Sequence, residues 1–220
     1  IRDAAERAAE LTRQLLVYAG RSPITMEPLD LWRCVQEIVG LCEDSAPSGA
    51  ALVAVGPSDE DLWVMADPGA LTQIVLNLVT NATQALSAEG GVVRVMARVE
   101  EVPADTLNTA SGDALPAATY AVLRVEDDGA GIDEATQARV FDPFFSTKST
   151  GRGLGLAVVD GIVRSHHGAV TIASEPGVGT VFEVYLPLTA QRPAFAAEGS
   201  TPPRVDGSAW ALLADDEPMV

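Results

Sequence analysis

Residues 67–82, DPGALTQIVLNLVTNA, carry the pattern of a half-buried helix, and the rest of the fold can be worked out from it. Asp67 followed by Pro68 is typical of a helix start, because aspartate caps free N–H groups and proline suits the first turn. Apolar residues then recur at helical spacing and predict a buried face: Leu71, Ile74, Val75, Leu78, Val79 and Ala82. Asn77 and Asn81 are four residues apart and share another face. Asparagine is unfavourable in the interior of a helix, so two of them on one face need an explanation. Either they are exposed polar residues, or their side-chain amide oxygens hold a magnesium ion.

The sequence around this helix alternates between helix and strand patterns. Two further helices are predicted, one over 31–42 with Asp30 as its cap and one beginning after Gly155. Strands are predicted over 52–55, 62–66, 92–99, 120–126, 170–174 and 181–186, the last two as a hairpin. Such a mixture predicts an α/β two-layer sandwich, with a mixed, mainly antiparallel sheet covered by helices on one face and one bundle helix ahead of it.

The turn EDDGAG (residues 126–131) follows one of the predicted strands. Gly129 and Gly131 let the backbone approach a flat ligand closely. The carboxylate of Asp127 could accept a hydrogen bond from the exocyclic amine of adenine, whereas guanine presents an acceptor at that position. An ordinary acidic turn is the alternative interpretation.

Two glycine- and aromatic-containing segments follow, FDPFFSTK (141–148) and GRGLGL (151–156). In the first, adjacent aromatics would anchor a mobile flap and Lys148, the sole lysine, would approach a phosphate. A packed loop with a surface lysine is the alternative.

In the segment GRGLGL, Gly151, Gly153 and Gly155 lead into a helix and would form a phosphate-binding loop from backbone N–H groups. The spacing matches neither the dinucleotide fingerprint nor the P-loop.

The composition limits the class of partner. The 220 residues carry a formal net charge of −17, which argues against unaided binding to nucleic acid or to an anionic membrane. An anionic ligand would need a bridging cation. No apolar run approaches the length of a membrane span. We therefore expect a cytoplasmic segment with no nucleic-acid partner and no direct membrane contact.

The two ends have different patterns. Residues 1–22 carry a heptad seam, which predicts a bundle helix that needs a partner helix. A helix packed on its own domain is the alternative. Residues 190–208 have the composition of a linker. Residues 209–220 hold a short apolar run that ends in Asp215 and Asp216, and could begin an α/β domain with a metal site.

In order and spacing, these segments resemble the catalytic ATP-binding domain of sensor histidine kinases, within the wider family of gyrase, mismatch-repair and chaperone ATPases. Residues 76–82, 127–131, 141–148 and 151–156 are similar to its N, G1, F and G2 boxes, and 177–182 to the ending that follows them. The resemblance covers residues 25–189 and implies ATP bound between the N-box helix and the lid. It implies magnesium on Asn81, with Asn81 and Lys148 as catalytic residues. The implied ATP-binding residues are Asn77, Asn81, Asp127, Gly129, Gly131, Lys148, Gly151, Gly153, Leu154, Gly155 and Thr180.

The flanks resemble parts of the same system. Residues 1–22 resemble the second helix of the dimerisation and phosphoacceptor hairpin, and residues 209–220 the start of a response-regulator receiver domain, as in hybrid kinases. The implied partners are the chain's own hairpin, a second copy in a homodimer, and a receiver, in a bacterial protein whose full length could be membrane-attached.

The expected function is transfer of the γ-phosphoryl group of ATP to a histidine upstream of Ile1, for relay to a response-regulator aspartate. His166 and His167 lie at a predicted helix end, away from the hairpin, so this chain is not expected to phosphorylate itself. An ATP-binding module without kinase activity is one alternative. A hydrolytic clamp is another, although Gln73 and Asn77 stand where hydrolysis would need a carboxylate.

Overall fold

The computed structural model describes residues 25–43, 49–57, 61–104, 109–110, 112, 114–148 and 153–192. The predicted bundle helix (1–22), most of the predicted linker (193–208) and the receiver-like segment (209–220) lie outside the described residues. The division of the chain into these parts therefore stays a prediction.

One five-stranded sheet forms a whole layer of the structure. Its strands are β2 (Ala50–Val55), β4 (Gly91–Val102), β5 (Ala118–Asp127), β6 (Ala169–Glu175) and β7 (Gly179–Pro187). Their order is β2-β4-β5-β7-β6, with β2 parallel to β4 and every other neighbouring pair antiparallel. The mixed, mainly antiparallel sheet and the β6–β7 hairpin are both confirmed.

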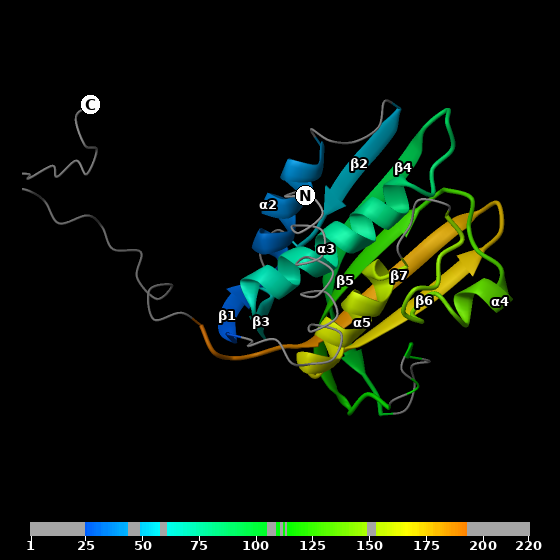
Figure 1. Ribbon diagram of the computed structural model, residues 1–220. Helices are drawn as coiled ribbons and strands as arrows, with labels where there is room; N and C mark the ends of the chain where they lie inside the picture. Colours follow the sequence, from blue (N-terminus) through cyan, green and yellow to red (C-terminus); the bar gives the residue numbers. More distant parts are fainter. Residues whose placement is uncertain are drawn as a thin grey trace, which may run out of the picture.

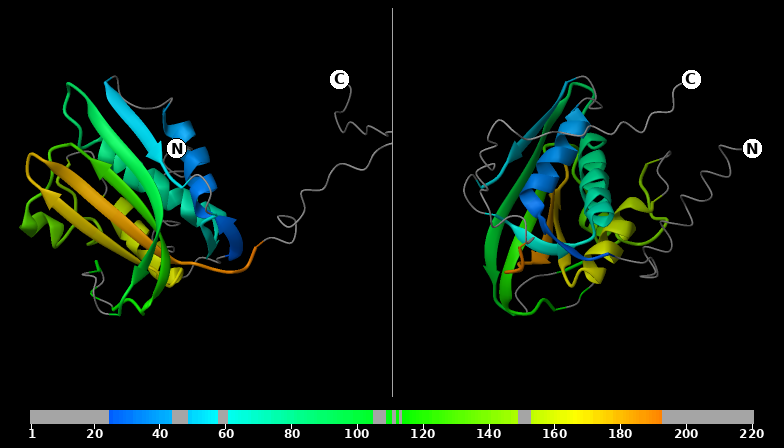
Figure 2. Two further views of the ribbon diagram at one scale, coloured as in Figure 1. Left: turned by 180° about the vertical axis from the view of Figure 1, so that it is seen from behind. Right: turned by 90° about the vertical axis from the view of Figure 1, so that its left-hand side faces the viewer.

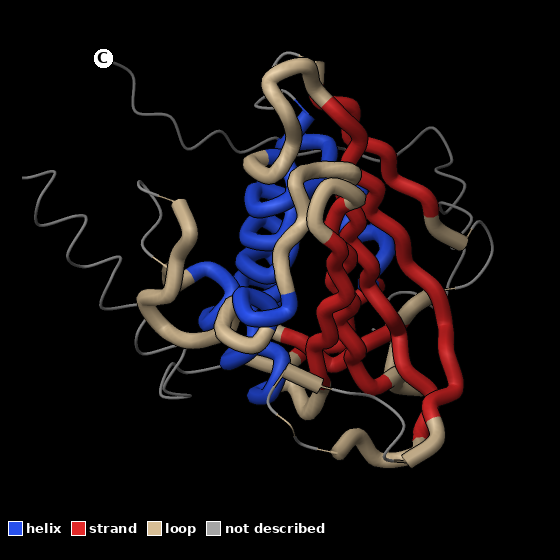
Figure 3. The backbone as a smooth tube through the Cα atoms, turned by 90° about the vertical axis from the view of Figure 1, so that its right-hand side faces the viewer, coloured by secondary structure: helices blue, strands red, loops and turns tan. Residues whose placement is uncertain are grey.

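The helices α2 (Leu31–Glu43), α3 (Pro68–Thr83) and α5 (Gly155–Ser165) cover one face of this sheet (Figure 1). The view from behind shows the other face bare of helices (Figure 2), and the tube view separates the two layers (Figure 3). The main core lies between the layers, and the apolar face predicted for residues 71–82 is buried in it. The α/β two-layer sandwich is thus confirmed. No helix within the described part of the chain is long and apolar enough to cross a membrane.

Helix α3 begins where the sequence predicts. Asp67 is its N-cap, and its Oδ1 accepts a hydrogen bond from the N–H of Ala70 at 2.9 Å. The N–H of Asp67 in turn donates to Nε2 of His166 at 3.1 Å, and His166 lies at the end of α5 with 4% of its surface exposed. His166 is at a helix terminus as expected, and it also ties the start of α3 to the end of α5.

Two small elements were not predicted. Strand β1 (Glu27–Asp30) pairs with β3 (Trp63–Ala66) in a separate two-stranded sheet. Pro28 lies within β1 and lacks an N–H for the ladder, so the sequence does not suggest a strand there. Helix α4 (Glu134–Gln137) is a single turn with Asp133 as its N-cap, too short to show a helical period.

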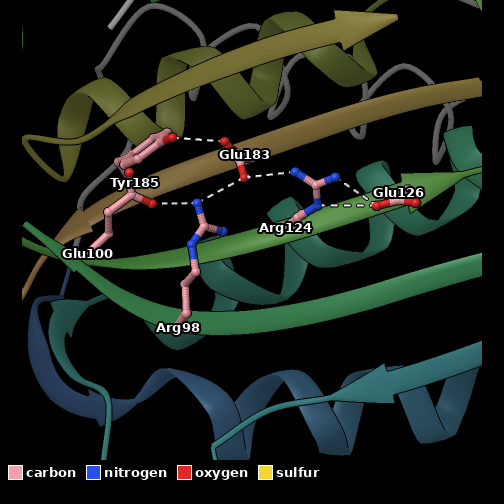
Figure 4. Close-up of polar contacts among 6 residues, drawn as sticks. All are labelled: Arg98, Glu100, Arg124, Glu126, Glu183 and Tyr185. Carbon is pink, nitrogen blue, oxygen red and sulfur yellow. Dashed lines mark hydrogen bonds and ion pairs between the residues drawn. The ribbon is translucent and has the colours of Figure 1, made fainter. Parts of the chain in front are cut away.

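The exposed face of the sheet carries an ion-pair network across three strands (Figure 4). Arg124 on β5 contacts Glu126 at 2.7 Å and Glu183 on β7 at 3.2 Å, and Arg98 on β4 contacts Glu183 at 3.0 Å. Because side chains alternate along a strand, these residues point away from the helices. The network therefore braces the sheet on the side opposite the cavity described next.

Candidate functional site

A cavity of about 370 Å³ lies where α3, the turn after β5, residues 145–148, residues 153–156 and the start of β7 meet. This volume falls within the range of small-ligand pockets, roughly 300–1,000 Å³. The predicted site residues that line it are Asn77, Asn81, Asp127, Gly131, Lys148, Gly153, Leu154, Gly155 and Thr180. Gly151 lies outside the described residues, and Gly129 is next to the cavity without lining it. Residues that are 103 positions apart in sequence, from 77 to 180, thus line one cavity.

Asn77 and Asn81 face the start of α5. Nδ2 of Asn77 donates to the carbonyl oxygen of Gly155 at 3.2 Å. A Cβ built on Gly155 would lie 3.5 Å from Oδ1 of Asn77 and 3.9 Å from Nδ2 of Asn81. Both amides therefore face the cavity, where α3 meets the N-terminus of α5, rather than open solvent.

Asp127 is a buried carboxylate at the end of β5. Only 5% of its surface is exposed, and its Oδ1 accepts the N–H of Gly129 at 2.9 Å. Burial raises the pKa of Asp127, while backbone N–H groups of Gly129 and Thr180 and the positive charge of Lys148 act against that rise. A buried group of this kind inside a cavity is typical of a functional position.

Lys148 turns its ammonium into the cavity. Its Nζ donates to Oε1 of Gln84 at 2.9 Å. Loss of surrounding water lowers the pKa of Lys148, and the carboxylate of Asp127 opposes this. Gln84 was not singled out from the sequence, although it follows Asn77 and Asn81 at helical spacing along α3 and its adjoining turn.

The adjacent aromatics of residues 141–148 were predicted to anchor a flap, and this prediction is wrong for one of them. Phe144 has a backbone φ of 67° and is 62% exposed, so its side chain turns outward. The anchors are its neighbours: Phe145 lines the cavity with the guanidinium of Arg139 4.3 Å from its ring centre, and Phe141 packs edge-to-face on Phe182. The N–H of Phe144 donates to the carbonyl oxygen of Gly153 at 2.7 Å, which fixes this turn.

Two glycines meet a steric requirement of the site. Gly131 and Gly153 have φ values of 61° and 65°, which disfavour other residues. A Cβ on Gly131 would overlap the carbonyl oxygen of Glu175, and one on Gly153 would press on the backbone of Phe144 and Phe145. Both positions allow neighbouring backbone to close around the cavity.

Part of the cavity wall was missed from the sequence. Ile132, Thr136 and Val140 recur every four residues and form one side of it. Their spacing was the available signal, but the helical turn between them is too short to stand out. Leu156 and Phe182 add further apolar surface, and this surface suits a flat, hydrophobic ligand.

The donor set fits a magnesium ion that comes with its ligand. Within the described ranges, no group of three or more His, Cys, Asp or Glu residues could hold a metal on its own. The amides of Asn77 and Asn81 offer hard oxygen atoms at the cavity. Magnesium in proteins is commonly bound through one or two protein groups together with substrate phosphates and water.

The two-layer fold and this cavity define a class of nucleotide-binding ATPase domains, and the comparison with known families agrees. Residues 66–190 match the family of histidine kinase-, DNA gyrase B- and HSP90-like ATPases, and the chain belongs to this family. The expected resemblance to the histidine kinase ATP-binding domain is confirmed, and membership implies ATP binding.

Sensor kinases are the relatives by sequence. The chain is 36% identical to sensor kinase CckA of Brucella abortus over 231 residues, covering 100% of this chain and 24% of CckA. It is 32% identical to the histidine kinase AtoS of Escherichia coli, covering 83% of this chain and 27% of AtoS. The solved structure of full-length ShkA in complex with AMPPNP is 25% identical, with a TM-score of 0.63, covering 85% of this chain and 37% of ShkA. The chain thus spans about a quarter of the length of CckA and of AtoS.

Proposed function

We propose that this chain binds ATP with magnesium and presents the γ-phosphoryl group to a histidine nitrogen on a dimerisation hairpin. The supporting observation is the single cavity in which the asparagine face, Asp127, Lys148 and the glycine turns converge, in a chain of this ATPase family. The relative ShkA was solved with AMPPNP, which favours a nucleotide as the ligand here.

Each group has a chemical role in this proposal. Asp127 accepts from the exocyclic amine of adenine, and Asn81, with Asn77 beside it, offers an amide oxygen to magnesium. The backbone at Gly153, Leu154 and Gly155 opens α5, where free N–H groups and the helix dipole favour phosphate. Lys148 leaves Gln84 and meets a phosphate oxygen.

The reaction is a phosphoryl transfer in which the chain positions groups and stabilises charge. The bond between the γ-phosphorus and its bridging oxygen breaks, a bond from phosphorus to the histidine nitrogen forms, and ADP leaves. A neutral imidazole is already nucleophilic and loses its proton after attack. Magnesium, when bound, supplies charge neutralisation at the phosphates. Lys148 and the N–H groups at the start of α5 stabilise negative charge on the moving group.

The structure favours kinase chemistry over a hydrolytic clamp. Hydrolysis needs a base that orients water near the phosphates. Among the described residues lining the cavity, Asp127 carries the only carboxylate, and it already accepts N–H groups of Gly129 and Thr180. The asparagine face offers amides that cannot accept a proton in this way.

We extend the proposal to the whole protein as the sequence predicts it. The hairpin, a second copy in a homodimer and a response-regulator receiver domain are the proposed partners, in the bacterial cytoplasm where ATP is available. The phosphoryl group would pass from the histidine to a receiver aspartate.

The test combines this chain with a separately produced hairpin that contains the phosphoacceptor histidine, in the presence of γ-labelled ATP and magnesium. We expect acid-labile label on the hairpin, absent when the acceptor histidine is replaced by glutamine. Release of free phosphate with no labelled hairpin would favour the clamp. ATP binding with neither product would favour a module without kinase activity.

A further inference from the structure

Ser174, near the end of β6, has a hydroxyl group with three polar contacts, two of them to residues that line the cavity. It donates to the carbonyl oxygen of Gly179 at 2.7 Å, it lies 2.9 Å from Oγ1 of Thr180, and it accepts the N–H of Ile132 at 2.9 Å. Thr180 and Ile132 line the cavity, whereas Ser174 does not. Ser174 is therefore one step removed from any ligand.

The three contacts together fix where each proton lies. A serine hydroxyl has one proton to donate and two lone pairs that accept. The Gly179 carbonyl can only accept, so it takes the Ser174 proton, and the Ile132 N–H can only donate, so it uses one lone pair. Only the second lone pair of the Ser174 oxygen then remains for Thr180. The Thr180 hydroxyl must therefore donate its proton to Ser174.

This arrangement determines what Thr180 offers to a ligand. With its own proton held by Ser174, its hydroxyl has only lone pairs left for the cavity. Thr180 is 6% exposed, pairs with Asp127 across β5 and β7, and gives its backbone N–H to that carboxylate. Two neighbouring side chains thus both present acceptors at the end of these strands.

We propose that Ser174 is a positioning residue for purine specificity, because it holds the Thr180 hydroxyl as an acceptor beside Asp127. A 6-amino purine offers a donor to this pair, whereas a 6-oxo purine offers an acceptor and meets two lone-pair groups. The inference rests on the proposed ATP binding and adds the residue that sets the polarity of the base pocket.

The chain offers a matched control in Gln137. Its Nε2 donates to the carbonyl oxygens of Ile132 at 2.9 Å and Ser174 at 2.8 Å. It therefore braces the same turn against the same strand without touching the Thr180 hydroxyl. If Ser174→Ala acted only by loosening this turn, Gln137→Ala would have the same effect. If it acts by freeing the Thr180 proton, Gln137→Ala would leave nucleotide preference unchanged.

The experiment compares ATP with inosine triphosphate, which differs at the 6-position of the base, by calorimetry on the full chain with magnesium. We expect the wild-type chain to prefer ATP and Ser174→Ala to reduce that preference about tenfold, as for a buried group whose partner is removed. Ser174→Thr, which keeps the hydroxyl, should restore the preference, and Gln137→Ala should keep it. An unchanged preference in Ser174→Ala, or an equal loss in Gln137→Ala, would overturn the inference.

A second variant covers the case in which Ser174→Ala does not fold. Thr180→Val removes the hydroxyl itself and should lower the ATP preference to a similar extent; a full preference in this variant would also overturn the inference. A wild-type chain that binds neither nucleotide would instead overturn the proposed function, and this inference with it. Those two failures are thus distinguishable from the wild-type titration alone.

Discussion

Asp127 shows at the scale of one residue how function can oppose stability. Its carboxylate is buried and its pKa is raised, so the folded chain disfavours the charged form. The native state then binds more protons than the unfolded chain as pH rises through about 4, and stability falls over that range. An amide at this position would keep an acceptor for Gly129 without a buried charge.

We therefore expect Asp127→Asn to raise the free energy of unfolding at neutral pH while it weakens ATP binding at least tenfold. The stabilisation should shrink as pH falls to about 4 and below, where the wild-type carboxyl is protonated in both states. Urea unfolding at several pH values measures the first effect and calorimetry the second. The difference in free energy of unfolding between Asp127→Asn and wild type is the quantity compared at the two pH values. A gain in stability that is smaller at pH 7 than at pH 4 would contradict the assignment of a buried charge.

Lys148 is the second residue whose surroundings make a sharp prediction. Its ammonium contacts Gln84 within the cavity and is the only cationic side chain among the described residues that line it. Lys148→Met should weaken ATP binding about tenfold or more and leave adenosine binding within about twofold, because only the phosphates use the charge. Equal losses for ATP and adenosine in competition binding would show that the side chain acts on the base or on folding.

At the level of elements, the long periodic segments were all predictable, whereas two of the short elements, β1 and α4, were not. Helix α3 has a proline start, an N-cap and six buried apolar residues at helical spacing, so local and tertiary preferences agree. β1 contains a proline and α4 has one turn, so their pairing and packing are set by distant partners that no local pattern reveals. The outward turn of Phe144 depends on one positive φ, which an aromatic sequence does not suggest.

The candidate site follows the same rule. Asn77 and Asn81 were predictable because asparagine is unusual within a helix, whereas Asp127 was assigned chiefly because residues 127–131 resemble the G1 box; all three line the cavity. Gln84 and Ser174 were missed because each is an ordinary polar residue in the sequence. Gln84 is singled out only by its contact with a lysine 64 positions away, and Ser174 by its contact with a threonine 6 positions away.

The N-cap of α3 should make a measurable contribution to the stability of the fold. Asp67 accepts N–H groups from Ala70 at 2.9 Å and from Thr25 at 3.0 Å. Hydrogen bonds from these groups hold the pKa of Asp67 below its ordinary value although burial alone would raise it. Asp67→Ala should lower the free energy of unfolding by about 1 kcal/mol, and Asp67→Ser should recover most of it. Chemical denaturation of the three proteins measures this, and equal stability of Asp67→Ala and wild type would rule out a working cap.

At the scale of the whole molecule, the net charge of −17 opposes the approach of an anionic ligand. Salt screens long-range repulsion between like charges. The association rate of ATP should therefore rise as ionic strength increases from about 20 to 200 mM, and stopped-flow mixing measures it. A rate that falls over this range would show that a local positive field around Lys148 outweighs the charge of the chain.

Calorimetric titration of ATP into this chain shows whether one cavity binds adenosine triphosphate together with a divalent ion. We expect saturable binding at one site that depends on magnesium, weakens strongly in Asn81→Ala, and favours ATP over GTP. Absence of binding, binding that ignores magnesium, or equal affinity for ATP and GTP would contradict it.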